Sequence, residues 1–203
     1  MTRKSLTSLA LVSVLAMSAW GCSGKNSSMS MTMEKPTQPV QMKSLERFVG
    51  KWSGVAEFAP ATAEKMRKAM PVSDNGKAMQ TSFAGGDEWT WMMDGMTLRH
   101  EGWYDMGDGK KKNYAEVWTW DARKEKYRIF GLDNWGGHGD GWATASANGD
   151  SLHVTMTVTD IHGQTAKESG MIKFTNPNTI DWTWTVHGAG GKLEFVGSSK
   201  RSG

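Results

Sequence analysis

Short segments in which apolar and polar residues alternate recur along residues 44–203. The first segment, residues 48–58, places a set of apolar or small residues on one face: Phe48, Gly50, Trp52, Gly54, Ala56 and Phe58. Successive side chains of a β-strand point to opposite faces, so this spacing predicts a half-buried strand. Comparable segments predict nine further strands, at residues 78–92, 96–104, 112–121, 126–133, 141–147, 151–160, 165–175, 179–187 and 192–200.

Turn-forming residues separate these segments. Asp94-Gly95 predicts a tight hairpin. Gly85-Gly86 interrupts its segment and predicts a bulge or a sharp kink there. Residues 60–70 begin with a proline and contain helix formers, so they predict one or two helical turns that Pro71 ends. Other turns are predicted at Gly107-Asp108-Gly109, Asn148-Gly149 and His162-Gly163.

The order of the segments indicates an all-β fold. No pattern of a crossover helix lies between the strands, so parallel pairing is not expected. About ten antiparallel strands in simple order leave no open edge when the sheet closes on itself. The sequence therefore predicts a ten-stranded antiparallel up-and-down β-barrel with a short helical insertion after the first strand.

The N-terminus has the pattern of an export signal. A basic pair precedes the apolar run 9–17, and small residues lead to the single cysteine of the chain, Cys22. The run is shorter than the ~20 residues that a membrane-spanning helix needs. Ala19-Trp20-Gly21-Cys22 resembles the bacterial lipobox, although Ala19 and Trp20 depart from its usual residues. We therefore predict a lipoprotein signal peptide over residues 1–21 and a lipid anchor to the membrane at Cys22; an ordinary secreted protein with one cysteine is the alternative.

The next residues predict a tether and a location. Residues 22–43 are rich in Ser, Gly, Pro and Gln without apolar periodicity, which predicts a flexible tether before a barrel domain over residues 44–203. Ser23 follows the cysteine, and by resemblance to enterobacterial lipoproteins this favours the outer membrane, facing the periplasm. Without residues 1–21 the chain keeps 22 basic and 21 acidic residues and has no basic cluster, which argues against a nucleic-acid partner.

Several motifs in order resemble domain-of-unknown-function family 1579. They are Phe-x-Gly-x-Trp at residues 48–52, the stretch 102–105 with Gly102 and Tyr104, Trp118-Thr119-Trp120-Asp121 with Tyr127, and Leu193-Glu194-Phe195 before Lys200-Arg201. The resemblance covers about residues 44–201 and implies a lipocalin-like, calycin-type barrel. It implies no established activity and no catalytic residue.

A similar Gly-x-Trp opens haem-binding barrels of the nitrobindin type, which place a ligand histidine near the C-terminus. The last predicted strand has no histidine, and the nearest one is His187, one strand earlier. We therefore predict no cofactor and keep haem only as a remote alternative.

Tryptophan pairs form the main candidate site. The two rings of each pair lie two residues apart and share one face of a strand. Such a wall suits a small apolar ligand, but large rings also fill barrel cores. Glu116 shares a face with two of the rings, which supplies one polar group. The candidate cavity-lining residues are Trp52, Trp89, Trp91, Trp103, Glu116, Trp118, Trp120, Trp182 and Trp184.

Two other patterns carry alternatives. Residues 134–141 concentrate glycines around His138 and Asp140, which is typical of an exposed connection and supplies too few ligands for a metal site. Met29, Met31 and Met33 have the soft thioethers that select Cu(I), or belong to a spacer.

Three functions remain open at this point. The first is a cell-envelope lipoprotein that binds a small apolar ligand or has a structural role. The second is an enzyme that acts in the barrel with Glu116 as interior carboxylate, which interior acids or histidines in hydrogen-bonding distance of one another would favour. The third is copper handling through the methionine-rich tether.

Overall fold

The computed structural model describes residues 35–69, 80–107 and 109–203 of the chain. The predicted signal peptide, Cys22 and the three tether methionines lie outside these residues. The described fold belongs to a unit that spans Pro36–Gly203. Within the described part, no helix is long and apolar enough to cross a membrane.

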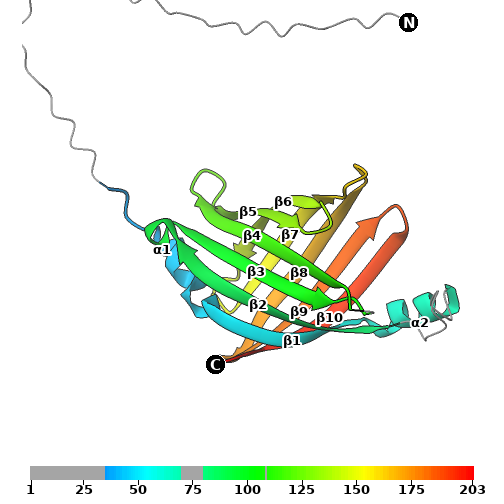
Figure 1. Cartoon of the computed structure of the whole chain (residues 1–203). Helices are drawn as coiled ribbons and strands as arrows, with labels where there is room; N and C mark the ends of the chain where they lie inside the picture. Colours follow the sequence, from blue (N-terminus) through cyan, green and yellow to red (C-terminus); the bar gives the residue numbers. More distant parts are fainter. Residues whose placement is uncertain (1–34, 70–79, 108) are drawn as a thin grey trace, which may run out of the picture. The chain divides into compact units, whose positions relative to one another are not determined.

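Ten antiparallel strands form a closed barrel in chain order (Figure 1). Each strand pairs with the next one along the chain, and β1 pairs with β10 to close the sheet, which confirms the predicted architecture. The strands are β1 (Gly50–Phe58), β2 (Ser82–Met92), β3 (Thr97–Asp105), β4 (Lys111–Asp121), β5 (Lys126–Asp133), β6 (His138–Ala145), β7 (Ser151–Thr159), β8 (Thr165–Asn176), β9 (Thr179–Gly188) and β10 (Gly191–Arg201).

Short helices lie at both ends of the barrel. α1 (Val40–Lys43) continues into the 3₁₀ helix η1 (Ser44–Phe48) before β1, and η2 (Met93–Gly95) connects β2 to β3. α2 (Pro60–Ala69) is the predicted insertion after the first strand, and its ten residues make about three turns rather than one or two. Figure 1 shows α1 and α2 at opposite ends of the barrel. Pro71, the predicted stop, lies outside the described residues.

The residues before β1 form a plug that the sequence assigned to other structures. Residues 40–43 were predicted as tether and residue 48 as strand, but both belong to helices whose apolar side chains are buried. Met42, Leu45 and Phe48 enter one end of the barrel, which we call the packed end. The plug was not predicted because it shows no long periodic pattern. Only three of its nine residues have buried apolar side chains. The packed end also contains Trp52, Trp89, Leu98, Trp118, Tyr127, Ile129, Ala143, Leu152, Val154, Phe174 and Ile180.

Local turn chemistry sets the strand register. A hairpin turn is present at Asp94-Gly95, but its loop has four residues, 93–96, and Met93 (φ 50°), Asp94 (φ 54°) and Gly95 (φ 84°) all have left-handed φ values. At the β5–β6 turn, Asp133 Oδ1 accepts hydrogen bonds from the backbone N–H groups of Trp135 and Gly137, both at 2.9 Å. These short connections keep neighbouring strands adjacent and antiparallel.

Two local predictions need correction. Of the bulge or sharp kink predicted at Gly85-Gly86, the bulge is absent, because the pairing of β2 runs unbroken through both glycines on both sides. The glycines instead make room, because a Cβ atom at Gly85 would lie 2.8 Å from the Tyr104 ring. The predicted connection 134–141 is shorter than expected, since β6 already begins at His138.

Candidate ligand-binding site

The strand register determines which side chains face the barrel interior. Buried Trp52 in β1 lies opposite Asp87 in β2. Two residues along β2, Trp89 lies opposite His100 in β3, which in turn lies opposite Glu116 in β4. Directly opposed residues share a face of the sheet, so all five side chains point inward.

The same register places the predicted cavity-lining residues. Trp103 is the exception, because it lies opposite Asn113 and Gly86 on the outer face, where Lys111 Nζ is 4.1 Å from its ring centroid. Its position in β3 is an odd number of residues from inward-facing His100, so it points outward, and the Lys111 ammonium group makes a cation–π contact with its ring. The inward-facing members are Trp52, Trp89, Trp91, Glu116, Trp118, Trp120, Trp182 and Trp184.

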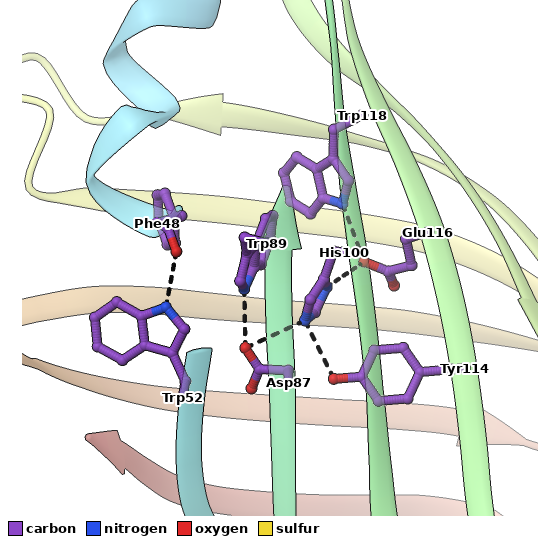
Figure 2. Close-up of polar contacts among 8 residues, drawn as sticks. All are labelled: Phe48, Trp52, Asp87, Trp89, His100, Tyr114, Glu116 and Trp118. Carbon is purple, nitrogen blue, oxygen red and sulfur yellow. Dashed lines mark hydrogen bonds and ion pairs between the residues drawn. The ribbon is translucent and has the colours of Figure 1, made fainter. Parts of the chain in front are cut away.

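Six inward-facing residues form a connected polar cluster in the middle of the barrel, which we call the His100 network (Figure 2). His100 Nδ1 lies 2.9 Å from Glu116 Oε2, and His100 Nε2 lies 3.2 Å from the Tyr114 hydroxyl and 3.6 Å from Asp87 Oδ1. The indole N–H groups of Trp118 and Trp89 donate to Glu116 Oε2 and Asp87 Oδ1, at 3.0 and 2.9 Å. Strands β2, β3 and β4 supply Asp87, Trp89, His100, Tyr114, Glu116 and Trp118.

The two carboxylates keep His100 protonated. Burial alone would lower the pKa of His100, but hydrogen bonds and charge from Asp87 and Glu116 raise it to about 9. The imidazolium then donates from both ring nitrogens. The Trp89 ring stacks on the imidazolium at 3.8 Å between centroids, which adds a cation–π contact. His100 is therefore a fixed cation between two anions near neutral pH.

Two tyrosines and a third carboxylate extend the polar wall beyond the His100 network. Tyr104 stacks on Tyr114 at 5.5 Å, and burial raises the pKa of Tyr104 to about 12, so both hydroxyls stay protonated. Across the barrel in β8, Glu168 accepts a hydrogen bond from Trp184 Nε1 at 2.8 Å. Burial raises the pKa of Glu168 above its usual value, and the negative charges of Glu116 and Asp133 add to this rise.

Several inward-facing rings lie over glycines of the neighbouring strand. A Cβ atom would lie 2.0 Å from the Trp184 ring at Gly170, 2.2 Å from the Trp182 ring at Gly197 and 2.4 Å from the Tyr114 hydroxyl at Gly102. Glycine thus lets each ring lie against the inner wall of the sheet. These rings therefore line the barrel interior.

Accessible surface distinguishes the two halves of the interior. At the packed end Trp52 and Trp118 are each 2 % exposed. The side chains of His100, Glu116 and Asp87 also point inward, yet they keep 13, 18 and 19 % of their surface. We call the half beyond them the open half; its partly exposed inward-facing residues are Phe58, Tyr104, Tyr114, Asp133, Ala166, Glu168, Val186, Leu193 and Phe195.

The other histidines and the metal candidates lie elsewhere. His138, Asp140 and His187 occupy outward-facing positions on β6 and β9, where Asp140 pairs with Arg128. His187 therefore cannot reach a ligand inside the barrel. No group of three or more His, Cys, Asp or Glu residues in the described part could hold a metal ion.

Most of the polar residues of this site were not predicted from the sequence. Glu116 was predicted, but His100, Asp87, Tyr114 and Glu168 were not. The spacing from the predicted turns could have found them. Trp89 and His100 are the same number of residues away from the Asp94-Gly95 turn, and these two residues pair across β2 and β3. His100 and Glu116 are likewise the same number of residues away from Asp108, and they pair across β3 and β4. Folding the sequence about these two turns brings the polar residues together.

Comparison with known proteins identifies the fold and no family. No protein-family model and no curated protein matches the chain, so the resemblance to domain-of-unknown-function family 1579 stays a prediction. Among solved structures, Rv2717c from M. tuberculosis matches with a TM-score of 0.57 at 10 % identity, over 82 % of this chain and 100 % of that one. The S-type phycobiliprotein lyase CPES from Guillardia theta matches with a TM-score of 0.51 at 14 % identity, over 79 % of this chain and 92 % of that one. The chain thus has the fold of a calycin-like ten-stranded barrel.

Proposed function

We propose that the protein binds a small molecule in the open half of the barrel. The observation that carries this proposal is the surface that inward-facing polar and aromatic residues keep around the His100 network. A barrel stabilised only by its core buries such residues completely, as Trp52 is buried at the packed end. Pockets that bind small ligands combine mainly apolar walls with a few convergent polar groups.

Native mass spectrometry of the full chain tests the binding proposal. We expect an extra mass that is retained under native conditions and lost on denaturation. Ala166→Trp places a large ring inside the open half, whereas Thr165→Trp at the neighbouring position faces outward. The extra mass, and the fluorescence of added Nile red, should be lost only with Ala166→Trp. Equal binding by both variants would place the ligand elsewhere, and a bare mass with no dye binding would contradict the proposal.

We also propose that the protein is a lipoprotein of the bacterial cell envelope. The support is the sequence of residues 1–21 and the single cysteine that follows it. Cys22→Ser should move the protein from the membrane fraction to the soluble fraction and remove the mass of the acyl chains. An unchanged distribution would favour an ordinary secreted protein.

An enzyme is the second candidate, because an acid and a histidine lie within hydrogen-bonding distance of one another inside the barrel. His100 and Glu116 lie 2.9 Å apart inside the barrel, and the pKa of His100 is shifted. However, an imidazolium with a pKa of about 9, and both nitrogens directed at protein acceptors, has no lone pair to act as a base near neutral pH. A carried molecule that changes mass with the wild-type chain but not with His100→Gln would favour the enzyme.

Copper handling rests on the tether alone, since Met29, Met31 and Met33 lie outside the described residues. Retention of Cu(I) by the full chain, lost when all three are changed to serine, would support it. No retention would reduce the tether to a spacer.

A further inference from the structure

Three inward-facing carboxylates use only one of their two oxygens within the protein. Asp87 Oδ1 accepts from Trp89, Glu116 Oε2 accepts from His100 and Trp118, and Glu168 Oε2 accepts from Trp184. The second oxygen of each has no hydrogen-bond partner among the described residues. No unpaired side-chain oxygen there is fully buried, so these three oxygens lie on accessible surface.

The inward-facing cations of the described strands are already engaged. His100 lies between Glu116 and Asp87, and Lys112 Nζ is 3.1 Å from Asp133 Oδ2. Arg201 is at the packed end, where it donates to the carbonyl of Val49 and lies over the Trp52 ring. The inner wall therefore presents more negative than positive charge.

The surroundings of the three free oxygens are aromatic. Trp184 lies close to Gly170, Tyr104 to Gly85 and Tyr114 to Gly102, so aromatic rings line the inner wall beside the carboxylates. The faces of aromatic rings attract cations. This arrangement is independent of the carboxylates and favours the same sign of charge. An anionic ligand would meet repulsion from the carboxylates.

We propose that the ligand is an organic cation, with an ammonium group that pairs with free carboxylate oxygens of the inner wall, that of Glu168 first among them, and an apolar body that packs against the rings. The inference rests on the proposed function and specifies the ligand class. An ammonium group is a hydrogen-bond donor only, so it pairs with acceptors that the protein leaves open. Lys112 already attracts Glu168, and an ammonium group would add to this attraction and offset the repulsion from Glu116 and Asp133.

Three probes with one body and different head groups test the inference: 4-phenylbutylammonium, 4-phenylbutanol and 4-phenylbutyrate. Each is titrated into the full chain at pH 7, with tryptophan fluorescence as the readout. We expect the ammonium probe to bind at least about tenfold tighter than the alcohol, since charge-assisted hydrogen bonds exceed neutral ones. The carboxylate should bind most weakly.

Two matched variants locate the effect. Glu168→Gln should weaken binding of the ammonium probe about tenfold and leave the alcohol unchanged. Glu88→Gln makes the same change on the outer face of β2 and should alter neither. Equal affinity for the three probes would overturn the cation inference and leave the binding function standing, as would tighter binding of the carboxylate. No binding of any probe would overturn both.

Discussion

The two ends of the barrel use the same ten strands for different purposes. At the packed end, the plug fills the interior and is tied to the wall by polar contacts. Trp52 Nε1 donates to the Phe48 carbonyl at 2.7 Å, and the Tyr127 hydroxyl donates to the Gln41 carbonyl at 2.9 Å. In the open half, the inward-facing positions have charged and hydroxyl groups with accessible surface. The difference separates a part that stabilises the fold from a part that is available for recognition.

Trp89 connects these two regions. Its ring is 5.1 Å from the Phe48 ring of the plug and stacks on His100 on its other side. The His100 network therefore rests on the packed end and faces the open half. Groups held in this way lose little conformational freedom when a ligand binds.

The largest expected effect is the loss of a ring from the packed end. Phe48→Ala should lower the free energy of unfolding by about 3–5 kcal/mol, because the ring is buried between Trp89 and Phe174. Phe195→Ala makes the same change in the open half, where the ring is half-buried, and should cost about 1–2 kcal/mol. Urea unfolding of the full chain measures both. Equal losses would mean that the two halves do not differ in packing.

The next largest effect is a pH dependence of stability, which tests the ion pairs of His100 with Asp87 and Glu116. Because the pKa of His100 is raised from 6.5 to about 9, its stabilisation is complete below pH 6.5 and is lost as pH rises through 9. The free energy of unfolding should fall by about 3 kcal/mol across this range. His100→Gln should remove this dependence, and outward-facing His187→Gln should keep it. A flat wild-type profile would show that His100 is not held as a cation.

The barrel architecture could be predicted from the sequence because the signals that specify strands and turns are local. Alternation and turn residues such as Asp94-Gly95 lie within a few positions of the structure they specify, and the strands from β4 to β10 begin and end within about three residues of prediction. The plug was missed because it is short and follows a polar segment. Its helical conformation comes from packing against the barrel rather than from its own pattern.

The site was harder to predict because it depends on pairing across strands. Glu116 was found through its spacing from Trp118, within one strand. His100 has no such neighbour, and its role appears only once the register places Trp89 on one side and Glu116 on the other. Trp103 was wrongly assigned to the barrel interior for the same reason. Its ring suits a cavity wall, but only the strand register determines which face of the sheet it occupies.

A smaller effect tests how the open half keeps its rings against the wall. Gly170→Ala places a Cβ atom 2.0 Å from the Trp184 ring, so the ring must move. Overpacking of this kind costs about 1–3 kcal/mol, and near-ultraviolet circular dichroism should report the displaced indole. Gly188→Ala is the control, since its Cβ atom would lie 3.6 Å from Ala166, an ordinary contact. An unchanged spectrum for Gly170→Ala would mean that Trp184 does not depend on this glycine.

The smallest effect has the opposite sign and most directly separates recognition from stability. The raised pKa of Glu168 means that the fold favours its neutral form, so stability should increase as pH falls through this pKa toward the usual value. Glu168→Gln resembles the neutral form and can still accept from Trp184, so it should stabilise the chain by about 1 kcal/mol at pH 7, as removal of a functional charge commonly does. Asp87→Asn should instead destabilise it, because His100 loses a counter-charge. If Glu168→Gln were destabilising in urea unfolding at pH 7, Glu168 would belong to the packing of the fold and not to a site that gives up stability for binding.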